Sequence, residues 1–182
     1  MSCKQNIPPM KAFLKAFFVR HEPPVALRAN LRAGLAAIAG IALVGGLATW
    51  IDLPLLIAPL GATSGLLFGQ PSSALSQPIN VMGGYLVGTI VCEAAFFIFP
   101  GAWLAAAVAV GLTIVVMRAL RVTHPPAAAL PILGFGEPVH GVQLFLIVFM
   151  ACAVLIAFAL VVHNLPPRRP YPMPEEPDRK NG

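Results

Sequence analysis

Charged residues are scarce in this sequence of 182 residues, in which Asp, Glu, Lys and Arg together make up 10%. A water-soluble domain carries about a quarter charged residues, whereas here 58% of the residues are hydrophobic and the mean hydropathy is +0.81. The apolar residues recur in runs along the whole chain, so they do not form a single N-terminal signal segment. The composition therefore predicts an integral membrane protein and excludes a secreted soluble one.

Cysteine is also rare. Cys3, Cys92 and Cys152 are too few and too widely spaced for a disulfide framework or a metal cluster. The sequence has no nucleophile and base pair, no phosphate-binding loop and no nucleic-acid-binding motif. We therefore expect a protein that is not an enzyme, has no catalytic residues, cofactor or metal, and binds no nucleic acid. We expect the basic residues behind its net charge of +5 to set the orientation in the membrane and to contact the lipid bilayer.

The chain divides into three parts by composition. Residues 1–29 form a basic amphipathic leader that we expect to lie on the membrane surface. Residues 30–164 contain the apolar segments. Residues 165–182 are rich in Pro, Arg and Glu and have no apolar period, so we expect this tail to be disordered.

Four apolar segments are long enough to cross a membrane, at about residues 31–50, 79–99, 102–120 and 142–163. Two shorter segments, at about 54–68 and 125–133, are interrupted by proline and glycine. The predicted fold is therefore an all-α polytopic membrane protein with four long transmembrane helices and two short proline-broken half-helices. Glu93 lies inside the second long segment, where a carboxylate either reaches the interface or is a paired, functional group.

The two halves of the membrane region resemble each other. A shift of 67 positions lays Phe68-Gly69-Gln70-Pro71 on Phe135-Gly136-Glu137-Pro138, and Pro59 on Pro126. We infer internal repeats at about residues 31–99 and 100–163. Interrupted helices in matching places of two repeats indicate the central site of a transporter.

The sequence leaves open how deeply the short segments penetrate. If both re-enter, the chain crosses four times, the repeats are parallel, and Arg118 and Arg121 lie opposite the basic leader. If both cross, the chain crosses six times, the repeats are inverted, and the basic residues share one side. The bias of Lys and Arg favours six crossings, and the shortness of the second segment favours re-entry. In either case we expect both termini to be cytoplasmic, in a bacterial inner (plasma) membrane.

Chemistry is most concentrated between Arg118 and Pro131. Arg118 and Arg121 are spaced to share a helix face. Pro125 and Pro126 end that helix and start a new one, with Thr123 or His124 as its cap. Such a start is expected to leave free backbone N–H groups and a positive dipole end, which suit an anion. The alternative interpretation is a basic surface loop.

Further candidate ligands for the anion come from the first repeat. The helix start at Pro59, with Gly61, supplies backbone N–H groups, and Thr63, Ser64 and Asn80 supply neutral donors. A hydroxyl in a membrane helix more often bonds to its own backbone, which is the competing interpretation for Thr63 and Ser64.

Three blocks of the sequence resemble the HPP family of small integral membrane proteins. They are Ala58-Pro-Leu-Gly-Ala62, Ser76-Gln-Pro-Ile-Asn80 and Thr123-His-Pro-Pro-Ala127. The resemblance covers about residues 30–163. It implies importance for His124, Pro125, Pro126, the segment 59–62, Gln77, Pro78 and Asn80. Members of the family have been implicated in nitrite transport in chloroplasts and cyanobacteria, and many have no assigned role.

Two functions follow as hypotheses. The first is a transporter or channel for a small anion, with nitrite as the lead candidate and His124 as the candidate carrier of a coupling proton. The second is a non-transporting membrane scaffold or regulatory subunit whose glycine faces pack on partners. Because four spans are few to enclose a pore, we expect a homo-oligomer.

Overall fold

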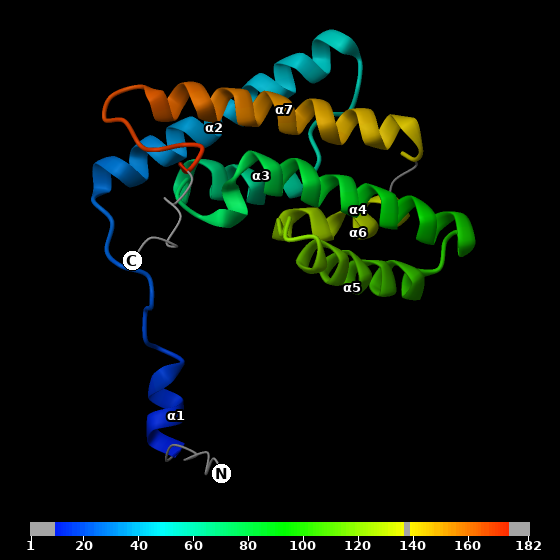
Figure 1. The fold of residues 1–182 in the computed structure, drawn as a ribbon, viewed down its shortest axis with the longest axis horizontal. Coiled ribbons are helices and arrows are strands. Elements are labelled where there is room, and N and C mark those ends of the chain that lie inside the picture. The colour runs from blue at the N-terminus through cyan, green and yellow to red at the C-terminus, as the bar shows by residue number, and fades with distance from the viewer. Residues whose placement is uncertain (1–9, 137–138, 175–182) are drawn as a thin grey trace, which may run out of the picture.

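The computed structural model describes residues 10–136 and 139–174, and within these residues every regular element is a helix. The elements in chain order are α1 (Met10–Ala16), α2 (Leu27–Ile51), α3 (Pro59–Ser64), the π-helix η1 (Gly65–Gly69), the 3₁₀ turn η2 (Ala74–Ser76), α4 (Pro78–Ile98), α5 (Trp103–Ala119), the 3₁₀ helix η3 (Pro125–Ala129), α6 (Leu130–Gly136) and α7 (Val142–Asn164). In Figure 1, α1 stands apart from a bundle formed by all the others.

Three helices, α2, α4 and α7, are long and apolar enough to cross a membrane. The fourth predicted long span is shorter. α5 has 17 residues, which is about 25 Å at 1.5 Å per residue and less than a hydrocarbon core of about 30 Å. It ends because Arg121 takes a left-handed backbone conformation with a φ of 60°, and the Val122 N–H then donates to the Met117 carbonyl.

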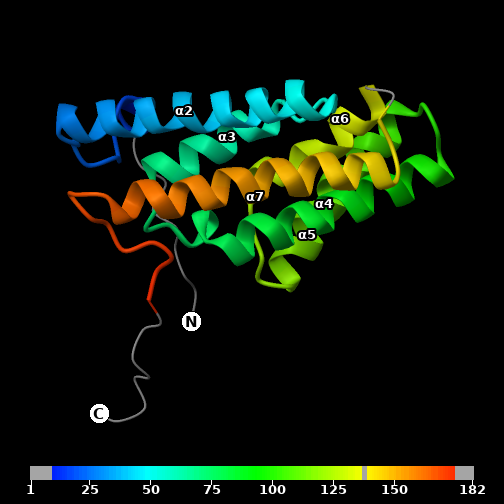
Figure 2. The same cartoon turned by 90° about the horizontal axis from the view of Figure 1, so that it is seen from above.

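The helices run along a common direction in alternating sense. Figure 2 shows α2 and α4 running one way and α5 and α7 running the opposite way. α2 packs on α7, α4 packs on both α5 and α7, and the short helices fill the space between them. The core therefore lies between α4, α7 and the short segments, where Tyr85, Leu60 and Leu130 are fully buried.

The short segments pass along the bundle and do not turn back. Pro54 and residues 56–58 line a cleft with Val139 and Leu144. η1 ends beside α7 residue His163, whose ring bonds to the Leu67 carbonyl. In the second half of the chain, the short segment begins beside the start of α4 and ends beside its far part, where Phe135 packs on Phe96. Each short segment thus runs along the bundle from near one end toward the other.

The two ends of the bundle differ in charge. The starts of α2 and α4 and the ends of α5 and α7 meet at one end, which we call the basic end, and its arginines are Arg28, Arg32, Arg118, Arg121, Arg168 and Arg169. The opposite end, which we call the acidic end, has Asp52 and Glu93 and, among the described residues, no Lys or Arg. This separation is the pattern of a membrane protein with one cytoplasmic face.

The prediction that the tail is disordered from residue 165 is wrong for residues 165–174. The Arg32 guanidinium donates to the carbonyls of Val162, Leu165 and Pro167, at 2.5, 2.9 and 2.6 Å. Tyr171 is buried, and its hydroxyl donates to the Ser76 carbonyl over 3.0 Å. The tail is ordered there because a cation satisfies the carbonyls at the end of α7 and because an aromatic side chain leaves water. Residues 175–182 lie outside the described residues.

Candidate functional site

The site forms where the two short broken segments meet. α3 contacts η3 near the middle of the bundle, and both rest on the first half of α4. His124 has an extended backbone, with φ of −136° and ψ of 97°, because the residue before a proline is excluded from the helical region. His124 is the N-cap residue of η3, one of the two predicted caps, but its side chain makes no cap hydrogen bond. The ring is instead directed to a buried cluster.

Glycines on α4 allow the His124 segment to lie directly on the helix backbone. A Cβ added at Gly84 would lie 2.6 Å from the His124 Cβ, and one added at Gly88 would lie 2.6 Å from the Ala127 carbonyl oxygen. Asn80 completes this seat, since its side-chain amide donates to the Thr123 carbonyl over 3.2 Å. The predicted small-residue face of α4 therefore packs against the His-Pro-Pro segment.

Three side chains form a buried polar cluster, which we call the central cluster: Thr63, Tyr85 and His124. The Thr63 hydroxyl lies 2.8 Å from the Tyr85 hydroxyl and 3.0 Å from His124 Nε2. His124 Nδ1 lies 2.8 Å from the Leu75 carbonyl oxygen. All three side chains are 0% exposed. In an apolar interior such groups are tolerated only when they satisfy one another.

The hydrogen-bond partners determine which ring nitrogen carries the proton. The Leu75 carbonyl can only accept, so His124 Nδ1 donates to it, and Nε2 of the neutral ring accepts from the Thr63 hydroxyl. Thr63 in turn accepts from Tyr85. The Pro59 carbonyl, 3.2 Å from the Thr63 oxygen, is the alternative acceptor for the Thr63 proton. The chain of donors thus runs from Tyr85 through Thr63 to His124.

His124 is therefore held neutral. It lies outside the three long spans, and burial lowers the pKa of its imidazole to about 4, although the bond to the Leu75 carbonyl acts in the opposite direction. A group that stays neutral near pH 7 does not exchange a proton there. The proton-carrying role of His124 stays a prediction, and in this arrangement protein groups occupy both ring nitrogens.

The expected free N–H groups at the start of the second short helix are also missing. Pro125 and Pro126 have no N–H, and the Ala127 N–H donates to the His124 carbonyl over 3.0 Å. The double proline thus removes the donors that an anion would use. The hydroxyl groups that lie beside His124 are those of Thr63 and Tyr85.

The structure separates the other predicted site residues into two groups. Pro59, Pro126, Thr123 and Asn80 border the central cluster, the last two through the bond between the Asn80 amide and the Thr123 carbonyl. The remaining residues point elsewhere: Pro125, Arg118 and Arg121 are exposed near the basic end, and Gly61 and Ser64 line a separate cleft against α2. Ser64 is 2% exposed and its hydroxyl has no hydrogen-bond partner among the described residues.

Tyr85 and the Leu75 carbonyl are the parts of the site that sequence reasoning missed. The signal for Tyr85 was available, because the sequence has two tyrosines and this one falls inside an apolar span, where a phenol needs a partner. The Leu75 carbonyl had no signal, since any residue supplies one. Within the described residues, no cluster of three or more His, Cys, Asp and Glu side chains provides a metal site.

Comparison with known proteins identifies the family. A profile described as HPP, transmembrane region, matches residues 22–172. The chain belongs to the HPP family. Two transmembrane proteins of Dictyostelium discoideum are similar to it, one 30% identical over 130 residues and the other 30% identical over 126 residues. These matches cover 67% and 65% of this chain but 46% and 40% of the relatives, so the chain spans less than half the length of either. No solved structure matches the chain significantly.

The HPP match also corrects the extent of the resemblance, which the sequence blocks placed at residues 30–163. The matched region extends to residue 172 and so includes Tyr171, the residue that attaches the tail to Ser76. The triplet that gives the HPP family its name is His124-Pro125-Pro126 here, and its histidine is the member of the central cluster that contacts both Thr63 and the Leu75 carbonyl. Membership supports an integral membrane location, while the bacterial plasma membrane and the orientation of the termini stay predictions.

Proposed function

We propose that this HPP-family protein is a membrane transporter for a small inorganic anion, with nitrite as the lead candidate. The observation that carries the proposal is the central cluster, which brings three polar side chains together where two broken helices meet inside an apolar bundle. Buried polar groups of this kind in a membrane protein mark a substrate or ion path more often than they serve stability. Broken helices that meet at mid-depth are typical of secondary transporters.

The packing pattern supports an internal duplication. In this duplication, α2 corresponds to α5, α4 corresponds to α7, and the two short segments correspond to each other. The contact of α2 with α7 then has its counterpart in the contact of α5 with α4, and the contact of α4 with α7 is its own counterpart. Helices that correspond in this way run in opposite directions in Figure 2. We therefore infer inverted repeats related by an axis in the membrane plane, which is the arrangement that permits alternating access around a fixed site.

Access to the cluster differs between the ends. At the acidic end, Pro54, Ala58, Leu133 and Leu144 line a cleft of about 320 Å³ that lies before the first turn of α3. At the basic end, the exposed guanidinium groups of Arg118 and Arg121 raise the local concentration of anions. An anion at the centre would accept hydrogen bonds from the Tyr85 and Thr63 hydroxyls in place of the bonds that they make to each other and to His124.

The orientation and assembly form part of the proposal. Because the arginines gather at one end, that end is proposed to be cytoplasmic together with both termini. Labelling of a cysteine introduced at His21 or Pro174 by an impermeant thiol reagent in intact cells is expected to fail. Exposed apolar faces of α2 and α5 surround the bundle, and a homo-oligomer is proposed because few helices enclose the centre.

A non-transporting scaffold or regulatory subunit is the second candidate. It is favoured by the fact that the central cluster is satisfied internally, with both ring nitrogens of His124 bonded to protein. A polar cluster that only fixes the packing of three segments would be expected to have the same closed network.

Anion uptake in proteoliposomes separates the two candidates. We expect the purified protein to take up nitrite, and Thr63→Val to reduce uptake by about tenfold or more because the variant keeps the side-chain shape but loses the hydroxyl. Thr49→Val is the matched control, since the Thr49 hydroxyl is exposed and bonds to the Gly46 carbonyl of its own helix. Nitrate, chloride and formate test selectivity. Absence of flux for all four anions from folded protein would favour the scaffold.

A further inference from the structure

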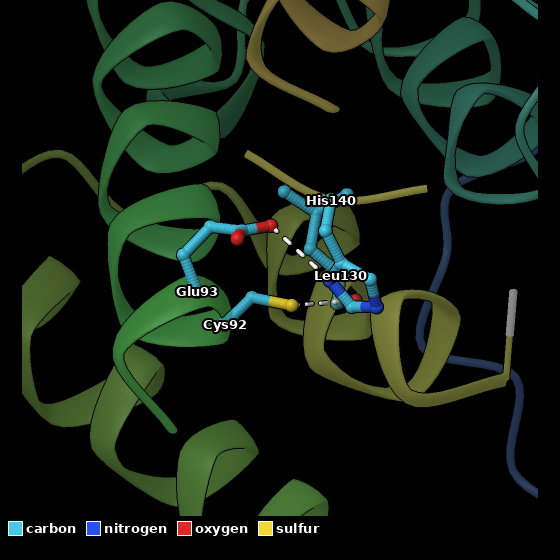
Figure 3. Close-up of polar contacts among 4 residues, drawn as sticks. All are labelled: Cys92, Glu93, Leu130 and His140. Atoms are coloured by element: carbon cyan, nitrogen blue, oxygen red, sulfur yellow. Dashed lines mark hydrogen bonds and ion pairs between the residues drawn. The ribbon is translucent and has the colours of Figure 1, made fainter. Parts of the chain in front are cut away.

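Two ionisable side chains, Glu93 and His140, lie together at the acidic end, away from the central cluster. The Glu93 Oε1 and His140 Nδ1 atoms are 3.5 Å apart, and the two side chains are 28% and 26% exposed (Figure 3). Both facing atoms are buried and have no hydrogen-bond partner among the described residues, so their contact is an approach of two ionisable groups rather than a formed hydrogen bond. The outer parts of both side chains are therefore exposed at the surface of the chain, while the two facing atoms are buried.

The surroundings hold His140 in place. Its ring stacks on Phe96, with the centroids 3.7 Å apart and an angle of 22° between the planes, and Phe96 packs edge-on against Phe135. Next to Glu93, the Cys92 thiol lies 3.6 Å from the Leu130 carbonyl (Figure 3). His140, which precedes α7, is thus held against α4 by stacking on Phe96 and by its contact with Glu93. The charge of the imidazole changes the strength of the contact with Glu93.

The pair is aligned with the central cluster along α4. Tyr85, Thr89 and Glu93 are spaced by four residues, so they lie on one face of the helix, and Tyr85 and Glu93 are separated by about 12 Å of helical rise. Thr89, between them, is 3% exposed, and its hydroxyl has no hydrogen-bond partner among the described residues. A buried hydroxyl without a partner is rare in folded proteins, and here it lies one turn from each group.

No other charged side chain of the described residues faces the pair. α6 has none, Arg118 of α5 lies at the basic end, and the ionisable side chains of α7, Cys152 and His163, lie at the levels of Tyr85 and the basic end. Cys92 neighbours Glu93 on α4 itself, and Glu137 lies outside the described residues. The charge of this region therefore depends on Glu93 and His140.

We propose that Glu93 and His140 form a proton-binding site that couples proton entry to anion movement. A proton from the aqueous side adds to the imidazole, and the pair of imidazolium and carboxylate has no net charge. Release of that proton leaves the carboxylate with a charge of −1. Because Val139, the neighbour of His140, lines the cleft toward α3, an anion in that cleft is repelled by the deprotonated pair and accepted by the protonated one. The proton and the anion therefore travel together.

The first test does not depend on transport. In detergent-solubilised full-length protein with ¹³C-labelled histidine, the Cε1 resonance of His140, assigned with His140→Gln, is expected to move with pH, since histidine changes charge between about pH 5 and 8. Its titration is expected to change in Glu93→Gln. The matched control is Asp52→Asn, which removes an exposed carboxylate at the same end and is expected to leave the resonance unchanged. A His140 resonance that does not move in this range, or that ignores Glu93→Gln, would overturn the site.

The second test rests on the proposed transport function. Nitrite uptake is measured in proteoliposomes with an inward proton gradient and internal pyranine as the proton probe. We expect the gradient to stimulate uptake by wild type and Asp52→Asn by about tenfold, and by Glu93→Gln and His140→Gln by less than about twofold. Stimulation that persists in both of the latter variants would overturn the coupling. If wild type transports no nitrite, the proposed function fails while the histidine titration still decides the proton site.

Discussion

The two histidine sites of this protein differ in what surrounds the ring. His124 is fully buried, and a carbonyl and a hydroxyl occupy its two nitrogens. His140 is about a quarter exposed, and a carboxylate faces its Nδ1 atom. The name-giving motif contains the first histidine, but the carboxylate partner and the partial exposure belong to the second. The difference teaches that the partner and the exposure of a histidine, more than its motif, indicate whether it handles protons.

Gly88→Ala is expected to disturb the centre most strongly. The new methyl group would lie 2.6 Å from the Ala127 carbonyl oxygen, a backbone atom that cannot rotate away, and overpacking of this kind costs about 3 kcal/mol. Gly111→Ala is the matched control, since its Cβ would meet nothing within 4 Å, and alanine in a helix is favoured by up to about 1 kcal/mol. Thermal unfolding in detergent measures both. Equal melting temperatures for the two variants would contradict the close seating of the His-Pro-Pro segment.

Thr63→Val is expected to destabilise the centre by about 2 to 3 kcal/mol, because Tyr85 and His124 Nε2 then lose a partner inside the protein. Thr49→Val is expected to change stability by less than about 0.5 kcal/mol at its exposed position. Denaturant unfolding of both variants measures the difference. A loss below about 1 kcal/mol for Thr63→Val would mean that water replaces the hydroxyl, and the centre would then be wetter than the structure indicates.

Acid is expected to weaken the centre through His124. The pKa of this histidine is about 4 in the folded protein and about 6.5 when unfolded, so between these values the unfolded chain binds the extra proton. Stability is therefore present above about pH 6.5, and about 2 kcal/mol of it is lost between pH 7 and 5. His124→Gln should flatten this dependence of the unfolding free energy, whereas His140→Gln should keep it. A slope unchanged in His124→Gln would show that other groups cause the acid sensitivity.

Tyr171→Phe is expected to have the smallest effect, about 1 kcal/mol, since it removes one hydrogen bond to the Ser76 carbonyl and keeps the buried ring. Tyr171→Ala removes the ring as well and should cost about 3 kcal/mol. Limited proteolysis at the basic end, compared with melting temperature, measures both. If neither variant exposes a cleavage site near residues 70–77, the tail does not hold that connection.

The membrane character, the long apolar helices and the glycine face of α4 could be predicted because each depends on a local pattern. Composition gives the first, and residue spacing gives the other two. The prediction of free N–H groups at the start of the second short helix was wrong because a proline has two effects on a helix start. Two prolines start a short helix, as expected, but they also remove the N–H groups that an anion needs, and the Ala127 N–H bonds to the His124 carbonyl.

The long-range contacts had no local signal. The partner of His124 Nδ1 is a backbone carbonyl 49 residues away, and Tyr171 bonds to a carbonyl 95 residues away. Every residue carries such a carbonyl, so residue type does not identify the partner. The tail looked disordered because its composition is polar and rich in proline, yet one arginine of α2 and one buried ring are enough to order residues 165–174.

The attachment of the tail to Arg32 has a consequence for biogenesis. Arg32 lies in the first long helix, and the carbonyls that it binds are 130 to 135 residues later in the chain. During synthesis, the first helix leaves the ribosome long before its partners exist, so the basic end can close only after residues 162–167 have been synthesised. A premature stop codon directly after α7 would then give a chain that inserts its helices but lacks the tail contacts that close the basic end, and quality-control proteases would detect the missing contacts rather than a missing helix.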